Sequence, residues 1–529
     1  MKMLLHGGTI IDGTGKKPYK ADILIERERI SAIGQFPDIE NCQKINVSGL
    51  MVTPGFFDCH THSELCLMYN RQHPNCLYQG VSGVMTGMCG LGFAPMKSDQ
   101  WEPSIRMNAG IFENHSGQLH RWSTFSEWMD QLNGCAVNVA SLATHNAIRQ
   151  YACGFDDVPL TGHALEKACA ALDSALSEGA SGFSVGLSYY PGTFSDTQEL
   201  IELNRVVAKH NAVFCVHLRL NIFGPDFKPM DEISHVVEET GVRLHMLHHR
   251  TKNPTTIGHP EKITAPFDNV IRKGAKVTFE YYPYLAGAGY MLVLLPGWVQ
   301  EGGPDKVFER LKDPQLRNKI LKDITERYPL IVSTGTSGVI THVKDPYSDD
   351  IGKNFEQLAD ERGMTIPEMI VDMLIENELE VGWHGTEPED EEIRNQLFDD
   401  QFSLLSMPNY TIGSDTILAG DLCHPRAFGT YPRVIAFARD RGMAPETIIR
   451  KITALPADIY DLKDRGLLKP GYYADICAFD WDRITDHATF IEPRKAATGV
   501  SLLLVNGRIA LDDGHITGIL AGNALKREG

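Results

Sequence analysis

The sequence lacks both a long hydrophobic run and a recognisable leader peptide. No apolar stretch approaches the roughly 20 residues that a membrane-spanning helix needs. The opening residues, MKMLLHGGTIIDGTG, have a short apolar patch followed by turn signals and charge, which is not typical of a secretory signal. The 11 cysteines show no framework spacing, so we interpret them as mostly buried thiols in a reducing compartment. These absences predict a cytoplasmic protein with no membrane partner.

The sequence has fewer basic than acidic residues. Lys and Arg number 50 against 68 Asp and Glu, giving a formal net charge of -18. This balance argues against nucleic acid and anionic membrane surfaces as partners. It does not exclude an acidic small molecule, because a few local Arg or Lys residues can override the global field. The charge is therefore compatible with an acidic small-molecule substrate, and the sequence does not predict the oligomeric state.

Both ends of the chain are rich in β-strand patterns. Near the amino terminus, LLHGGTIIDGTG and ADILIERERISAIG combine β-branched residues with Asp-Gly and Thr-Gly turn signals. Near the carboxyl terminus, GVSLLLVNGRIALDDG carries an Asn-Gly hairpin signal between apolar strands. We predict that residues 1–54 and 460–529 together form one small β domain, with an α/β domain over residues 55–459 between them.

The middle of the chain alternates short apolar runs with helical patterns. Successive runs are often about 30 residues apart, which is the size of a strand-plus-helix unit. Eight such runs predict a (β/α)8 barrel. The gap at 285–408 is too long for a loop, so we interpret it as an insertion on the barrel with helices near 305–328 and 367–378. The inserted segment itself is predicted over approximately 287–345. The eight runs are 55–62, 83–90, 137–146, 179–189, 212–219, 242–250, 276–284 and 409–415.

The first of these runs ends in two histidines, His60 and His62. Side chains alternate faces along a strand, so Asp58, His60 and His62 are expected to share the face toward the barrel mouth. With 20 histidines in 529 residues, chance alone predicts ~0.75 such pairs, so the pair by itself is weak evidence for a metal. Solvated loop histidines explain it equally well.

The other strand ends strengthen the case for a metal site. Other runs end in Cys89, His217, His248 with His249, and Asp415. Each of these residues alone is more often a packing or hydrogen-bonded core residue. As a set, they cluster at the carboxyl ends of strands, where barrel active sites lie. Thiolate and imidazole are ligands that zinc prefers, and an acid at the last strand can accept a proton from water.

The chain resembles a known family over nearly its whole length. PGFFDCHTH is similar to the first-strand signature of the amidohydrolase superfamily. More narrowly, the chain resembles the N-acyl-D-amino-acid deacylases, or D-aminoacylases. The resemblance implies an α/β fold: a metal-dependent (β/α)8 TIM barrel with a β-sandwich made from both termini. The matching segments, in the family's order, are QGVSGVMTGMCGLGFAPM, LATHNAIR, GFSVGLSYYPG, VHLR, LHHR, YYPYLAG, IGSD, HPRAFGTYPRVI and GLLKPGYYADICAFD.

The resemblance also implies a ligand set. Many relatives in the superfamily bridge two metals through a carboxylated lysine at the fourth strand, but GFSVGLSYY has no lysine, which fits a site centred on Cys89. Asp415 is implied as the general base and acid. The implied ligands are Cys89, His217 and His248 for one tightly bound Zn²⁺, and His60 and His62 for a second, weaker metal position.

Substrate contacts are implied in the same way. Arg250, Tyr189 and Tyr282 are candidates for binding the α-carboxylate of the leaving amino acid, since an Arg can bind a carboxylate through two parallel hydrogen bonds. The chain departs from the usual family pattern in having Arg250 instead of Lys, Ala288 instead of Ser, and Met88 instead of Asn. No role follows from spacing for His145, His424 and Arg426, and His249 is interpreted as structural.

The predicted activity is hydrolysis of the amide bond of N-acyl-D-amino acids to a carboxylate and a free D-amino acid. Zinc-activated water is the implied nucleophile, and the preference for the D configuration follows from the resemblance alone. A cyclic amidase of the dihydroorotase or hydantoinase kind is one alternative, and a D-aminoacyl dipeptidase is another. The non-enzyme alternative is a catalytically silent scaffold with the amidohydrolase fold.

Overall fold

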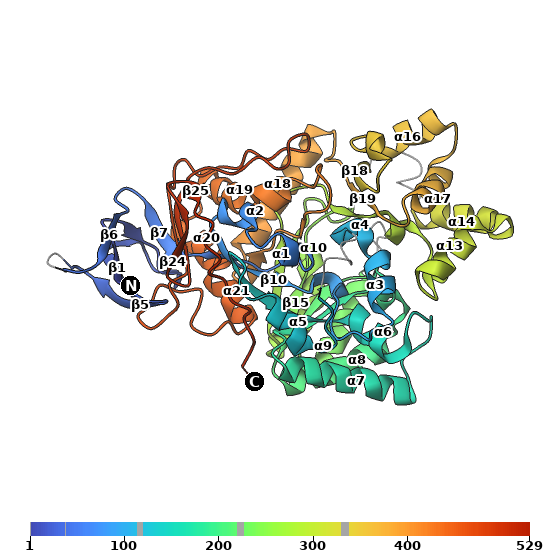
Figure 1. Ribbon diagram of the computed structural model, residues 1–529, viewed down its shortest axis with the longest axis horizontal. Coiled ribbons are helices and arrows are strands. Elements are labelled where there is room, and N and C mark those ends of the chain that lie inside the picture. Colours follow the sequence, from blue (N-terminus) through green and yellow to red (C-terminus); the bar gives the residue numbers. More distant parts are fainter. Residues whose placement is uncertain (1, 37–38, 114–119, 220–226, 329–337, 529) are drawn as a thin grey trace.

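Eight parallel strands close into a barrel at the centre of the protein (Figure 1). The computed structural model describes residues 2–36, 39–113, 120–219, 227–328 and 338–528. In the view of Figure 1, strands from both termini form a layered β domain at the left, and an inserted segment projects at the right. The α/β fold class predicted from the sequence is confirmed.

The barrel strands follow the predicted order. Three of them are divided by a short break, and the end of the last, β21, pairs in parallel with β9 of the first, Thr416 facing Thr61, which closes the barrel. Each of the eight predicted runs overlaps a barrel strand. The strands are β8 (Phe56–Asp58) with β9 (Thr61–His62), β10 (Val81–Thr86), β11 (Asn138–Ser141) with β12 (Ala143–Thr144), β13 (Gly182–Gly186), β14 (Val213–His217), β15 (Arg243–Met246), β16 (Val277–Tyr281), and β20 (Tyr410–Ile412) with β21 (Thr416–Ile417).

Amphipathic helices cover the outside of the barrel. In α7 the buried positions include Ala168, Leu172, Ala175 and Leu176, which recur at helical spacing on one face. Among the described residues, no helix is long and apolar enough to cross a bilayer. The main outer helices are α6 (His145–Cys153), α7 (Gly162–Ser177), α8 (Thr197–Lys209), α9 (Lys228–Thr240), α18 (Glu391–Ser406), α19 (Arg426–Asp440) and α20 (Pro445–Ile452).

Two sheets from both ends of the chain form the β-sandwich. One has the order β5-β4-β1-β6 and the other β25-β24-β23-β22-β7-β2-β3, so β7 pairs with β22 from the opposite end of the sequence. The Asn-Gly hairpin is present: Asn506 and Gly507 have φ of 48° and 71° between β23 and β24. The strands are β1 (Lys2–His6), β2 (Thr9–Ile10), β3 (Tyr19–Lys20), β4 (Asp22–Glu26), β5 (Arg29–Gly34), β6 (Gln43–Asn46), β7 (Met51–Pro54), β22 (Ile476–Phe479), β23 (Val500–Val505), β24 (Arg508–Asp512) and β25 (His515–Ile516).

The insertion between the seventh and eighth strands contains a small sheet as well as helices. Helices occur at both predicted places, but the sheet of order β17-β19-β18 was not predicted, and its last strand ends at residue 384, beyond 345. Residues 329–337 of the predicted insertion lie outside the described residues, and the domain boundaries stay a prediction. The elements are β17 (Ala288–Tyr290), β18 (Val339–Val343), β19 (Val381–His384), α13 (Pro304–Lys312), α14 (Pro314–Arg327), α16 (Phe355–Arg362) and α17 (Ile366–Glu376).

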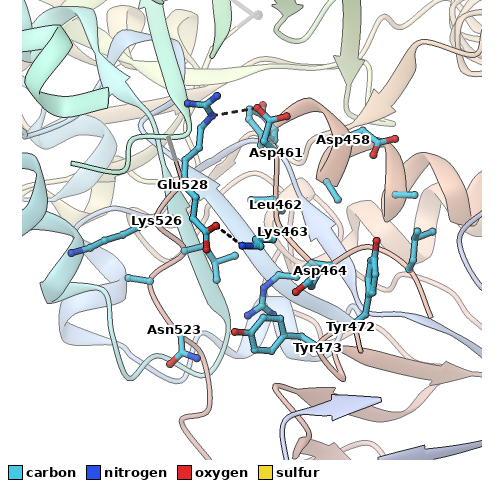
Figure 2. A pocket seen from close by; sticks show the side chains of 18 of the residues that line it. Asp458, Asp461, Leu462, Lys463, Asp464, Tyr472, Tyr473, Asn523, Lys526 and Glu528 are labelled. Carbon is cyan, nitrogen blue, oxygen red and sulfur yellow. Dashed lines mark hydrogen bonds and ion pairs between the residues drawn. The ribbon is translucent and has the colours of Figure 1, made fainter. Parts of the chain in front are cut away.

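A cavity of about 870 Å³ lies between α21 (Ala454–Ile459), the loop that follows it and the carboxyl-terminal residues 523–528 (Figure 2). Its charged side chains are largely paired, as in the ion pairs of Arg527 with Asp461 and of Lys463 with Glu528. The carboxyl-terminal residues hydrogen-bond to Val139, near the start of a barrel strand. The cavity therefore lies toward the amino-terminal end of the barrel, where barrel enzymes do not place their active sites.

Candidate metal centre

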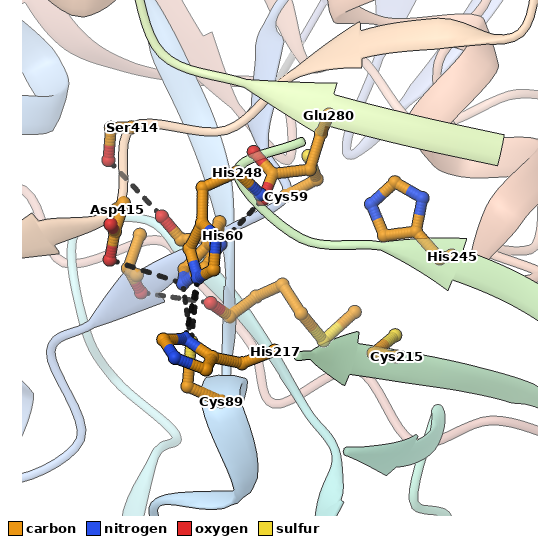
Figure 3. A network of polar contacts seen from close by, with 12 residues as sticks. Cys59, His60, Cys89, Cys215, His217, His245, His248, Glu280, Ser414 and Asp415 are labelled. Atoms are coloured by element: carbon orange, nitrogen blue, oxygen red, sulfur yellow. Dashed lines mark hydrogen bonds and ion pairs between the residues drawn. The ribbon is translucent and has the colours of Figure 1, made fainter. Parts of the chain in front are cut away.

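Two clusters of metal-binding side chains lie at the carboxyl ends of the barrel strands and share one cysteine. His60, His62 and Cys89 form the first cluster, and Cys89, His217 and His248 form the second. Within each cluster the ligand atoms lie within 4.8 Å of one another. Figure 3 shows His60, His217 and His248 converging from three different strands above Cys89. The structure thus brings together all five residues that the sequence suggested as metal ligands.

The first strand reaches the site through a break between β8 and β9. The Asp58 carboxylate accepts hydrogen bonds from the backbone amides of His60, at 3.2 Å, and Ser414, at 2.9 Å. The Asp58 side chain therefore binds the backbone of the first and eighth strands where the break interrupts the regular alternation of side chains. His60 and His62 nevertheless both point to Asp415.

Cys89 is presented by a tight turn after β10. Its φ of 54° is left-handed, an uncommon conformation for a residue with a side chain. The turn is held from two sides: Glu64 Oε1 accepts from the Gly87 amide at 2.6 Å, and Ser184 Oγ accepts from the Gly90 amide at 3.0 Å. A Cβ atom at Gly186 on β13 would overlap the Cys89 carbonyl oxygen. The turn therefore packs backbone to backbone against the fourth strand.

His217 is the last residue of the fifth strand, and His248 follows the end of the sixth. His217 Nδ1 lies 2.8 Å from His248 Nε2, and Cys89 Sγ lies 3.5 Å from the same nitrogen. Burial, followed by the charge of Lys252, lowers the pKa of His217 to about 3. Burial and His217 hold the pKa of His248 well below its usual range. Both imidazoles are therefore neutral and keep lone pairs that can bind a cation.

The donor chemistry of the two clusters fits zinc. Neutral imidazoles and a cysteine sulfur are the ligands that Zn²⁺ prefers. Burial raises the pKa of the Cys89 thiol to about 11, so a cation that binds the thiolate must displace a proton. Cys89 is the one residue common to both clusters, so a cation in either position would use its sulfur.

Asp415 stands between the first cluster and a buried arginine. Its Oδ1 lies 3.2 Å from His60 Nε2 and 3.3 Å from His62 Nε2, while its Oδ2 lies 2.9 Å from Arg426 Nη1. Burial alone would raise the pKa of Asp415, but Arg426 and then His60 outweigh it and hold that pKa well below its usual range. The carboxylate is therefore ionised and able to accept a proton.

Arg426 is the functional residue to which sequence reasoning gave no role. It is the first residue of α19, and its side chain is fully buried. Apart from the ion pair with Asp415, its guanidinium has no hydrogen-bond partner in the part of the chain that the structure describes. Burying a charge costs desolvation free energy, so a buried arginine with one ionic partner indicates a role at the site. The only sequence signal was its place in CHPRAFGTYPR, 11 residues after Asp415.

The three predicted substrate residues lie around the same site. Arg250 donates to the Leu285 carbonyl at 2.9 Å and to the Tyr282 hydroxyl at 3.4 Å. The guanidinium carbons of Arg250 and Arg426 lie 5.0 and 4.5 Å from the centre of the Tyr282 ring, so this ring contacts both cations. The Tyr189 ring centre is 4.6 Å from that of His217.

The other histidines named from the sequence have local partners. His249 Nε2 donates to the Ile263 carbonyl at 2.8 Å, away from both clusters. His424 Nδ1 accepts from the Arg426 amide at 3.1 Å. His145 Nε2 lies 2.7 Å from Glu199 Oε1, and Arg149 pairs with the other oxygen of the same carboxylate. This buried network ties α6 to α8, both of which pack outside the barrel.

Removing the carboxylate of this network should destabilise the protein without changing its metal content. Glu199→Ala would leave Arg149 buried and unpaired, which is expected to cost about 3–5 kcal/mol in the free energy of unfolding. Glu202→Ala, on the same helix, removes an exposed pair with Arg205 and a hydrogen bond from Gln198, and should cost ~1 kcal/mol or less. Urea denaturation measures both variants. Equal losses for the two would contradict a structural role for the buried network.

Comparisons with known proteins agree with this geometry. Residues 392–511 match the model of the Amidohydrolase family. A D-aminoacylase of Alcaligenes xylosoxydans xylosoxydans is 29% identical over 99% of this chain and 97% of its own. A crystal structure of D-aminoacylase superposes with a TM-score of 0.80 at 28% identity over 99% of both chains. The structure of N-acyl-D-glutamate deacylase from Bordetella bronchiseptica superposes with a TM-score of 0.81 at 25% identity over 99% of both chains. That enzyme was solved with zinc and a phosphonate inhibitor that mimics the tetrahedral intermediate.

Together, the barrel, the two-sheet domain and the ligand clusters at the strand ends define a hydrolase of the amidohydrolase superfamily. The similarity in sequence and structure extends over the full length of the chain, and it is to one group of enzymes within this superfamily. Those enzymes are the N-acyl-D-amino-acid deacylases, or D-aminoacylases, to which the chain is similar over its full length.

Proposed function

We propose that this protein hydrolyses the amide bond of N-acyl-D-amino acids, giving a carboxylate and a free D-amino acid. The observation that carries the proposal is the position of Asp415, ionised and fixed between His60, His62 and Arg426. A carboxylate in this place can move a proton beside a cation held by the histidines.

Cys89, His217 and His248 are proposed to hold one Zn²⁺ tightly, with His60 and His62 at a second, weaker position. This division is supported by the contacts of the histidines: both clusters share Cys89, but of their histidines only the two of the first cluster are paired with Asp415 among the described residues. When bound, zinc supplies Lewis acidity, polarising the substrate carbonyl and lowering the pKa of water. The cytoplasmic location stays a prediction from the sequence.

Asp415 is proposed to carry the proton through the reaction. As general base it takes a proton from the water that attacks the acyl carbonyl carbon, and as general acid it gives that proton to the departing amine nitrogen. Arg426 holds Oδ2, which leaves Oδ1 directed at the histidines of the first cluster. The carboxylate therefore keeps one orientation while its protonation state changes.

The α-carboxylate of the substrate is proposed to bind at Arg250, Tyr282 and Tyr189, with Arg426 nearby. Arg250→Ala is expected to raise KM for N-acyl amino acids about tenfold to a hundredfold, since hydrogen bonds to charged groups contribute about 1.5–3 kcal/mol. N-acyl amines, which have no carboxylate, serve as the matched control and should show no change. Steady-state kinetics with both substrate types checks this, and an equal rise in KM for both would remove the role.

Two other enzyme activities and one non-enzymatic role compete with this proposal. A cyclic amidase, a D-aminoacyl dipeptidase and a silent scaffold are distinguished by a panel of N-acetyl-D-amino acids, their L counterparts, dipeptides and a hydantoin. We expect turnover of at least one N-acetyl-D-amino acid and at least tenfold weaker turnover of its L form. A tenfold difference in rate corresponds to roughly 1.4 kcal/mol in the activation free energy. Turnover of the hydantoin alone would favour the cyclic amidase. A purified protein without metal or activity would favour the scaffold.

A further inference from the structure

A glutamate inside the barrel touches candidate ligands from both metal clusters. Glu280 lies on β16, and its side chain is fully buried. Its Oε1 lies 2.8 Å from His60 Nδ1 and accepts the backbone amide of His248 at 2.6 Å (Figure 3). A buried carboxylate is costly unless it is paired, and here both bonds are made by Oε1, since Oε2 has no hydrogen-bond partner among the described residues.

The first bond sets how His60 presents itself to a cation. With Oε1 accepting from Nδ1, the proton of a neutral His60 is on Nδ1, and the lone pair is on Nε2. That nitrogen faces Cys89 Sγ at 3.5 Å and Asp415 Oδ1 at 3.2 Å. Carboxylates that hold the far nitrogen of a ligating histidine fix its tautomer and ring orientation.

The second bond acts on His248 through its backbone. His248 follows β15 with a left-handed φ of 37°, a conformation that costs free energy for a residue with a side chain. The hydrogen bond from its amide to Glu280 Oε1 stabilises this turn of the chain. The imidazole of His248 is then directed at His217 and Cys89.

Strand eight leaves room for the carboxylate. A Cβ atom at Gly413 would lie 2.5 Å from Glu280 Oε2 and 2.5 Å from His60 Cβ. Glycine at this position therefore lets the carboxylate and the first-strand histidine approach each other. The contact is built from the first, sixth, seventh and eighth strands together.

We propose that Glu280 is a positioning residue that couples the two metal positions, with one oxygen atom orienting a ligand of each. It does not touch the substrate and has no part in proton transfer. This inference rests on the proposed metal-dependent function. It predicts that the loss of Glu280 weakens metal binding at both positions.

The test uses three variants of Glu280 and one control in the full-length protein. Glu280→Leu removes the oxygen atom that accepts both hydrogen bonds. Glu280→Asp keeps the charge, but its shorter side chain does not reach His60 and the His248 amide. Glu280→Gln keeps an acceptor oxygen on a side chain of the same length. Thr278→Val is the matched control, because Thr278 lies on the same strand and binds His245 Nδ1 at 2.9 Å but no candidate ligand. Zinc affinity is measured by competition with a chelator, and zinc content by mass spectrometry.

Glu280→Leu and Glu280→Asp should bind zinc about 10–100-fold more weakly, as is typical when a carboxylate behind a metal ligand is lost. Their kcat should fall with metal content while KM stays within about threefold, and Glu280→Gln should recover most of the affinity. Wild-type affinity in a folded Glu280→Leu would overturn the inference, as would an equal loss in Thr278→Val. If Glu280→Leu does not fold, Glu280→Asp decides by the same criteria. A wild-type protein that binds no zinc would refute the proposed function itself.

Discussion

Replacing Asp415 by Asn is expected to lower kcat by about 10²–10⁴-fold, the usual contribution of a positioned general acid and base. Asn has the same shape as Asp and tolerates the left-handed φ of 54° found at this position. Its amide cannot take up the proton, so the attacking water would lose its base. The contacts with Arg426 and the two histidines would lose charge but not position.

Zinc content separates a chemical effect from a structural one. The Asp415→Asn variant should keep its zinc, because none of the three residues proposed for the tight position is altered. Asp58→Asn is the matched control: its carboxylate accepts the backbone amides of His60 and Ser414 near the same site, which an Asn oxygen can still do. That variant should lose less than about tenfold in kcat. Near-wild-type turnover in Asp415→Asn would rule out Asp415 as the base.

Removing the thiol of Cys89 is expected to empty both metal positions. Cys89 is the one residue common to the two clusters, so Cys89→Ala removes a ligand from each. A catalytic metal supplies several kcal/mol of transition-state stabilisation, so activity should fall about a hundredfold or more. Zinc content by mass spectrometry and kcat/KM across a zinc titration measure the two effects in the same preparation.

A second buried cysteine provides the control. Cys215 lies on β14 two residues before His217, is equally buried, and is outside both clusters. Cys215→Ala should lower stability by a small cavity cost and leave zinc content unchanged. If Cys89→Ala kept full zinc occupancy and activity, the sulfur would not be a ligand and the proposed metal positions would be wrong.

Much of the barrel is predictable because its signals are local. Each barrel strand is a short buried run, and the side chains that gather at the site follow directly at the carboxyl end of the run. His217 and Asp415 could be placed in this way without any knowledge of pairing. The Asn506-Gly507 hairpin is local for the same reason, since both residues take the left-handed conformation that this turn requires.

The features that escaped prediction depend on contacts between distant segments. The sheet of β17, β18 and β19 pairs Ala288 with His384 and Val343 with Val381, which are distant in sequence, and its strands are too short to show a periodicity. The role of Arg426 depends on its ion pair with Asp415, which forms only when α19 packs against the end of the eighth strand. Glu280 lies inside a buried strand, where its charge gives no hint of the two partners that it serves.

The turn at Cys89 also limits how this centre could be redesigned. Because Gly186 has no space for a Cβ atom beneath the Cys89 carbonyl, a side chain at this point of the fourth strand and the present turn cannot coexist. A ligand grafted there, such as a bridging lysine, would collide with backbone before it reached a cation. Exchanging one coordination chemistry for the other would therefore require remodelling the 87–91 loop together with the strand, and a point substitution would not suffice.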